Sequence, residues 1–160
     1  MEEVTTSLFD GVTAQEYDAM MTCFKPTVRA YGKGEEIPMP CGRVGIVQSG
    51  KLSLIKTDVN GVRTIFEQLK KGGVFGDVLG FSWADANFYL SADEDCEILY
   101  IDYEHIIKRC PNACTHHSVV VANLVQLMSE KTQALSEHLE ILSRRTIREK
   151  LSAYFSMLAA

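Results

Sequence analysis

Residues 72–77 read GGVFGD, a glycine-rich turn that ends on an acidic residue between two β-like segments. Such a turn is typical of a small-ligand pocket, and Gly76 and Asp77 are its candidate binding residues. No lysine or arginine occurs between Lys71 and Lys108, although that stretch carries eight acidic residues. Because a phosphate held away from water needs a cationic partner, we expect a ligand that carries no phosphate.

Aromatic residues crowd the segment that follows this turn. They are Phe81, Trp83, Phe88 and Tyr89. Aromatic side chains commonly line apolar ligand pockets, so we count these four among the candidate ligand-binding residues. The alternative interpretation is that they close the hydrophobic core of the domain.

A second group of reactive side chains lies later in the chain, at Cys110, Cys114, His116 and His117. Thiolate and imidazole groups bind zinc or haem, and the spacing is compatible with a helix. Pro111 interrupts a simple helix between the two cysteines, however. We therefore expect ordinary residues at the start of a helix, with no metal and no cofactor.

Catalytic patterns are missing from the sequence. No histidine precedes His105, so the strands cannot supply the ligand set of a small β-barrel metalloenzyme. No serine lies in the glycine pattern of a nucleophile elbow. The sequence predicts a binding protein and not an enzyme.

The elements that must position these residues change in character along the chain. Thr13 and Glu16 form a capping box, which predicts a short helix over about 13–23. Strand-like segments then follow at 44–48, 52–56, 62–69, 88–91 and 97–101. Asn60 and Gly61 indicate a tight hairpin between the second and third of these. Short strands at this spacing predict an antiparallel β sandwich or roll, and a short helix follows at 102–108.

From about residue 113 to 145 the chain contains neither glycine nor proline, which predicts one long helix. Apolar residues recur along it with heptad spacing, and the expected seam consists of Val121, Leu124, Met128, Leu135 and Leu142. A seam of this length indicates dimerisation between two helices, and therefore a homodimer. Lys131 and His138 interrupt the seam, so the alternative is a long helix packed on its own domain.

Overall composition is that of a globular protein, with 46% hydrophobic and 23% charged residues among 160. The sequence contains no run long enough for a membrane span and no signal peptide, so we expect a cytoplasmic protein with no membrane partner. Five cysteines without a framework spacing are expected as thiols. The net charge of −5 argues against nucleic-acid binding by this segment alone.

In order and spacing, four segments resemble the Crp/Fnr family of bacterial transcription regulators. They are VGIVQSGKL at 44–52, GGVFGD at 72–77, CEILYID at 96–102, and the long helix that runs into RRTIREKL at 144–151. The resemblance implies an α+β fold, in which an antiparallel β-roll (a double-stranded β-helix or jelly roll) is flanked by short helices and followed by a long dimerisation helix.

The resemblance also implies a domain organisation. Residues 1–110 are expected to form the effector-sensing roll, and 111–145 the dimerisation helix. Residues 146–160 would be the first helix of a winged helix-turn-helix DNA-binding domain that this sequence does not include. The implied partners are a second copy of the chain, an unknown small effector, DNA through that domain, and RNA polymerase.

Members of the family that bind cyclic nucleotides carry a phosphate cassette after the glycine turn. Asp77 matches the acidic residue that grips the ribose, whereas Ala86 stands where the phosphate-binding arginine belongs, followed by Asn87. Leu135 and Ser136 fall where the long helix touches the effector. We therefore expect an effector other than a cyclic nucleotide. The alternatives are a cyclic-nucleotide-binding regulator and a stand-alone ligand-binding or interaction module.

Overall fold

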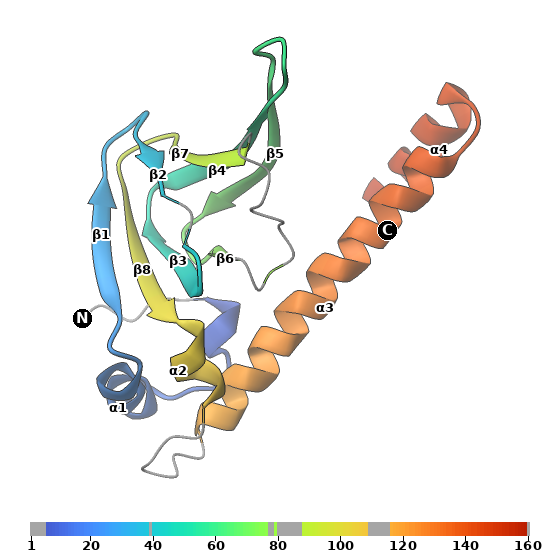
Figure 1. The fold of residues 1–160 in the computed structure, drawn as a ribbon. Helices are drawn as coiled ribbons and strands as arrows, with labels where there is room; N and C mark the ends of the chain where they lie inside the picture. Colours follow the sequence, from blue (N-terminus) through green and yellow to red (C-terminus); the bar gives the residue numbers. More distant parts are fainter. Residues whose placement is uncertain (1–5, 39, 77–78, 80–87, 109–115, 160) are drawn as a thin grey trace.

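The computed structural model describes residues 6–38, 40–76, 79, 88–108 and 116–159. Within these residues the strands form two antiparallel sheets of four strands each, which together make up the β-roll seen in Figure 1. The first sheet has the order β1 (Thr27–Tyr31), β8 (Cys96–Asp102), β3 (Arg43–Ser49) and β6 (Val74–Gly76). The second has the order β2 (Glu36–Ile37), β7 (Phe88–Ala92), β4 (Lys51–Thr57) and β5 (Arg63–Lys70). The α+β class and the antiparallel roll are thereby confirmed.

The two central strands of the first sheet, β8 and β3, are buried on both faces, and this explains the apolar run in β8. Ile98 and Tyr100 point into the core between the two sheets. Leu99 and Ile101 point the other way, into a second core shared with the helices. Since successive side chains of a strand alternate between faces, a strand covered on both sides needs apolar residues at every position.

Short helices form the second core at one end of the roll (Figure 1). They are the 3-10 helix η1 (Ser7–Phe9), α1 (Ala14–Phe24) and α2 (Tyr103–Ile107). The capping box predicted for α1 is present: the backbone N–H of Thr13 donates to Glu16 Oε2 at 2.8 Å, and the backbone N–H of Glu16 donates to Thr13 Oγ1 at 3.4 Å. The buried face of α1 includes Met20 and Phe24, both fully shielded from solvent.

The hairpin between β4 and β5 is confirmed, but its turn differs from the expected one. Of the two residues at its tip only Gly61 has a positive φ, +80°, so the turn is not the two-residue type that Asn60-Gly61 predicts. Asp58 organises a wider loop, because its Oδ1 accepts hydrogen bonds from the backbone N–H groups of Asn60 and Val62 at 2.8 Å each. An Asx-type interaction therefore replaces the tight turn.

The long helix α3 (His116–Ser143) leaves the base of the roll and extends well beyond it, and α4 (Ile147–Leu158) contacts its far part (Figure 1). The helix ends two residues before the predicted Arg145. A second capping box starts α4: Thr146 is its N-cap residue, and the hydrogen bonds of Thr146 lower the pKa of Glu149. Among the described helices, none is both long and apolar enough to cross a membrane.

Candidate functional site

The glycine turn at 72–76 leads into a strand that is paired with β3. Gly76 has φ +153°, and a Cβ atom built on it would lie 2.5 Å from the carbonyl oxygen of Arg43. Phe75 is 1% exposed and belongs to the core between the sheets. The close approach of β6 to β3 therefore accounts for glycine at position 76, whether or not a ligand binds beside it.

Part of the predicted site lies outside the described residues. This part comprises Asp77, Phe81, Trp83 and Asn87, and the same holds for Cys110 and Cys114 and for the side chain of His116. The described candidates are Gly76, Phe88, Tyr89, Leu135 and Ser136. They belong to β6, β7 and α3, three elements that are distant in sequence.

Phe88 and Tyr89 do not face the same space. Phe88 packs against the core between the sheets, and its ring meets that of Phe66 edge to face at 5.0 Å between centroids. The Nζ atom of Lys56 lies 4.8 Å from the centre of the Phe88 ring. Strand alternation directs Tyr89 to the opposite face of β7. The expectation that both aromatic residues line one pocket therefore needs correction, and of the two only Phe88 faces the roll interior.

Phe66 and Glu67 of the edge strand β5 lie near Phe88, although neither was among the candidate ligand-binding residues predicted from the sequence. Glu67 is paired in register with Leu54, which is buried between the sheets, so Glu67 projects from the same inward face. Its carboxylate binds Lys131 of α3, with 2.9 Å from Nζ to Oε1 and 3.1 Å to Oε2. The inward position of Glu67 follows from the register between β4 and β5, which places it opposite a buried leucine.

On α3, Leu135 is 58% exposed. The Ser136 hydroxyl donates to the backbone carbonyl of Thr132 at 3.0 Å. Neighbouring residues on a helix point about 100° apart, so the side chains of Leu135 and Ser136 leave α3 in different directions. Leu135 shares its face of α3 with Lys131, four residues earlier.

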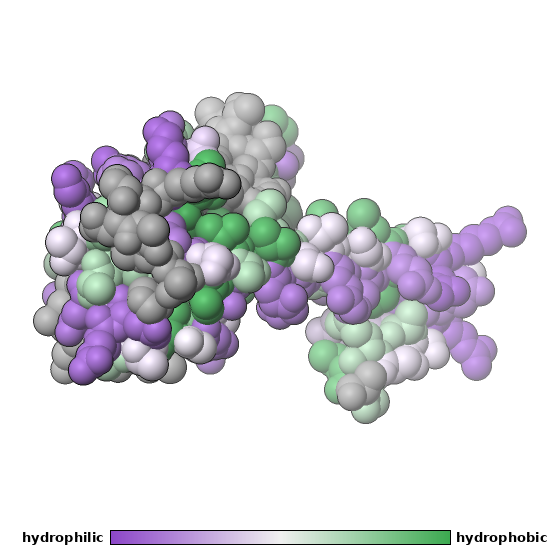
Figure 2. Space-filling view, turned by 90° about the horizontal axis from the view of Figure 1, so that it is seen from below, coloured by the Kyte–Doolittle hydropathy of each residue, from purple (hydrophilic) through white to green (hydrophobic). Residues whose placement is uncertain are grey.

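The predicted seam divides into a covered part and an exposed part. Leu124 is 5% exposed and packs in the helical core of its own chain, and Val121 packs against the same core. This corrects the assignment of Leu124 to a dimer interface, because the first part of α3 covers its own domain. Farther along, large apolar side chains are exposed: Val125, Met128, Leu135, Leu139 and Leu142. Figure 2 likewise shows hydrophobic surface on the projecting helical arm as well as at the base of the roll.

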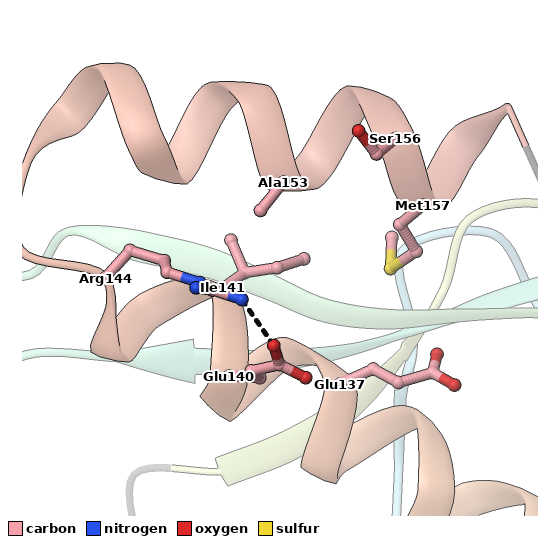
Figure 3. Close-up of a pocket in the computed structure, with 7 residues that line it drawn as sticks. All are labelled: Glu137, Glu140, Ile141, Arg144, Ala153, Ser156 and Met157. Atoms are coloured by element: carbon pink, nitrogen blue, oxygen red, sulfur yellow. Dashed lines mark hydrogen bonds and ion pairs between the residues drawn. The ribbon is translucent and has the colours of Figure 1, made fainter.

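Two of the hollows that described residues form contain no predicted effector residue. One lies between α3 and α4, around Ile141 and Met157, where Arg144 binds Glu140 (Figure 3). The other lies beside β1 and β8, next to Tyr31 and Cys96. Burial, followed by the charge of Glu35, raises the pKa of the Cys96 thiol, which makes this thiol a weak nucleophile.

The described residues show no group of three or more histidine, cysteine or acidic side chains arranged to hold a metal ion. His117 is 9% exposed, and its Nε2–H donates to the backbone carbonyl of His105 at 2.7 Å. Its ring stands edge-on to Phe24, 4.8 Å between centroids. These contacts fasten the start of α3 to α1 and α2.

Comparison with known proteins gives a consistent result. The family model described as the cyclic nucleotide-binding domain matches residues 29–112. The "Cyclic AMP receptor protein" of Thermus thermophilus is 27% identical over 152 residues, which cover 91% of this chain and 66% of that protein.

Solved structures agree in fold. The catabolite activator protein of Thermus thermophilus superposes with a TM-score of 0.68 at 24% identity, covering 86% of this chain and 63% of that one. A mutant of CooA from Carboxydothermus hydrogenoformans gives a TM-score of 0.63 at 18% identity and covers 97% of both chains. The present chain thus spans just under two thirds of the length of the two Thermus thermophilus relatives.

Proposed function

Because the chain belongs to the cyclic nucleotide-binding domain family and is similar to regulators of the Crp/Fnr family, we propose that it is the sensor and dimerisation region of a transcription regulator. In this proposal residues 1–110 sense a small effector, 111–145 dimerise, and 146–160 begin the DNA-binding part. DNA and RNA polymerase are then partners of the whole regulator. The chain itself carries out binding and relay and no catalysis.

The observation that carries this proposal is the path of α3. The helix starts in the core of the sensing domain, where Leu124 is buried, and ends on an exposed apolar stripe that includes Leu135 and Leu142. A single rigid element therefore contacts the roll at one end and offers a surface for a second copy at the other. A ligand that binds one arrangement of roll and helix more tightly than another would shift the packing of the two helices.

We propose that the effector is not a cyclic nucleotide. The stretch between Lys71 and Lys108 carries no permanent cation. The resemblance to cyclic-nucleotide-binding regulators also implies that Ala86 stands where they carry the phosphate-binding arginine. On the helix side, Lys131 is bonded to both oxygens of Glu67. A cyclic phosphate would either enter without a charged partner or compete with Glu67 for Lys131. Losing a charge-assisted contact weakens binding by about 2–5 kcal/mol.

A cyclic-nucleotide sensor is the second candidate, because the matching family model and the receptor from Thermus thermophilus both carry that ligand in their names. A stand-alone binding module without DNA binding is a third. The reading frame beyond Ala160 separates this module from a regulator, since a helix-turn-helix of roughly 60–80 further residues supports the regulator.

Calorimetric titration with cyclic AMP and cyclic GMP tests the proposed effector class. We expect no binding at micromolar concentrations for the natural chain, and Ala86→Arg serves as the matched variant that restores a guanidinium. Micromolar binding by the natural chain would show the charge argument to be wrong. Native mass spectrometry of the purified chain then searches for a co-purified effector.

A further inference from the structure

Among the described residues, an ion pair connects the roll to the long helix. Lys131 of α3 donates to both carboxylate oxygens of Glu67 on β5, across 64 positions of sequence. The two side chains are 26% and 29% exposed. By comparison, the Arg43–Asp102 pair joins two neighbouring strands and is 44% and 46% exposed, and Arg144–Glu140 lies within one helical end.

The pair sits where α3 changes from a packed to an exposed helix. Leu124 and Leu127 are the last residues of α3 that take part in the helical core, and Lys131 follows one turn later. Beyond it, three large apolar residues are more than half exposed: Leu135, Leu139 and Leu142. Lys131 therefore holds the helix at the outer end of its contact with the roll.

Glu67 lies on the inward face of the second sheet, opposite the buried Leu54. A shift of β5 is therefore transmitted to Lys131 directly, through two hydrogen bonds to one carboxylate. Because both side chains are largely shielded from water, removing one charge deprives the other, which is still partly buried, of this contact. That makes the pair more consequential than an exposed surface ion pair.

We propose that Glu67 and Lys131 form a latch that sets the direction in which α3 leaves the roll. This proposal rests on the proposed function. The latch fixes where the exposed apolar residues Leu135 and Leu142 of α3 lie relative to the sensing domain, and it thereby positions the proposed dimer interface. Movement of β5 on effector binding then changes the helix direction through this contact. The latch acts within one chain and exists with or without a second copy.

Backbone hydrogen–deuterium exchange of the full chain tests the latch. Glu67→Gln and Lys131→Met should each speed exchange at residues 128–143 by roughly three- to tenfold, while exchange at 117–124 stays unchanged. The charge-swapped double variant, E67K with K131E, should return the rates toward those of the natural chain. Asp102→Asn, which removes the Arg43 pair within the sheet, is the matched control and should leave α3 unaffected.

Unchanged exchange in both single variants, or a swap that recovers nothing, would overturn the latch. Repeating the comparison in a Leu135→Glu background separates this proposal from dimerisation. The latch effect must persist there, because the pair lies within one chain. Sedimentation of the same samples reports separately whether a dimer forms, so failure of the latch and failure of the proposed dimer give different results.

Discussion

Replacing Leu135 with glutamate should dissociate the proposed dimer. Leu135 is 58% exposed in the single chain and lies on the outer, exposed part of the apolar stripe. In a symmetric dimer each stripe meets its own copy, so one substitution changes the interface twice. A carboxylate in such a seam also has to be desolvated without a partner.

The magnitude follows from the exposed fraction. Fully burying a leucine contributes about 1.5–3 kcal/mol, so the part of Leu135 still open to burial is worth roughly 0.9–1.7 kcal/mol per copy. Two copies give roughly 2–3.5 kcal/mol, which corresponds to a loss of roughly 30- to 400-fold in dimer affinity. This is a lower bound for glutamate, because the desolvation cost of its charge adds to it.

Sedimentation velocity over a concentration series measures the effect, and circular dichroism checks that the helix content is retained. Leu151→Glu is the matched control, since Leu151 is 51% exposed but lies on α4. We expect that control to dimerise like the natural chain. An unchanged dimer in Leu135→Glu, or equal dissociation in Leu151→Glu, would refute the assignment of the interface to the α3 stripe.

Two further predictions concern stability. A Cβ atom at Gly45 would lie 2.4 Å from the Phe75 ring, so Gly45→Ala should lower the free energy of unfolding by about 1–3 kcal/mol in thermal denaturation. At Gly32 the added atom meets nothing closer than 3.9 Å, so the control Gly32→Ala should cost less. Equal losses of stability in the two variants would contradict the packing argument. Burial raises the pKa values of both Cys96 and Tyr100, so the unfolded chain loses these protons at lower pH than the folded one. Their contribution to stability is therefore complete below about pH 9 and declines as pH rises further. Chemical denaturation from about pH 8 to 11 should show that the free energy of unfolding declines less steeply in Tyr100→Phe than in the natural chain.

Where short-range chemistry decides a structure, the sequence predicted it closely. The capping box at Thr13 and Glu16 places the start of α1, because both hydrogen bonds lie within one turn. The apolar runs at 44–48 and 97–101 predicted the central parts of β3 and β8, because a strand covered on both faces carries apolar side chains at successive positions; each strand extends one residue farther at both ends. The long helix was predicted from the absence of glycine and proline, and it is present.

Other elements depended on distant partners and were not predictable in detail. The strand β6 exists because β3 lies beside it, and in sequence it looked like part of the glycine turn. The end of α1 at Lys25 uses a left-handed φ of +46°, which is uncommon for a residue other than glycine. The heptad spacing of Leu124 cannot distinguish a partner helix from the chain's own core, because both bury the same side of the helix.

The sequence by itself determined the class of fold, the family and the lack of a cation in the stretch after the glycine turn, because residue type and local spacing carry this information. Only the tertiary structure decided which face each candidate presents. It placed Phe88 toward the interior and Tyr89 away from it, buried Leu124 in its own core, and brought Glu67 to Lys131. The physical reason is that strand register and helix direction arise from packing between distant segments, which composition and periodicity constrain only weakly.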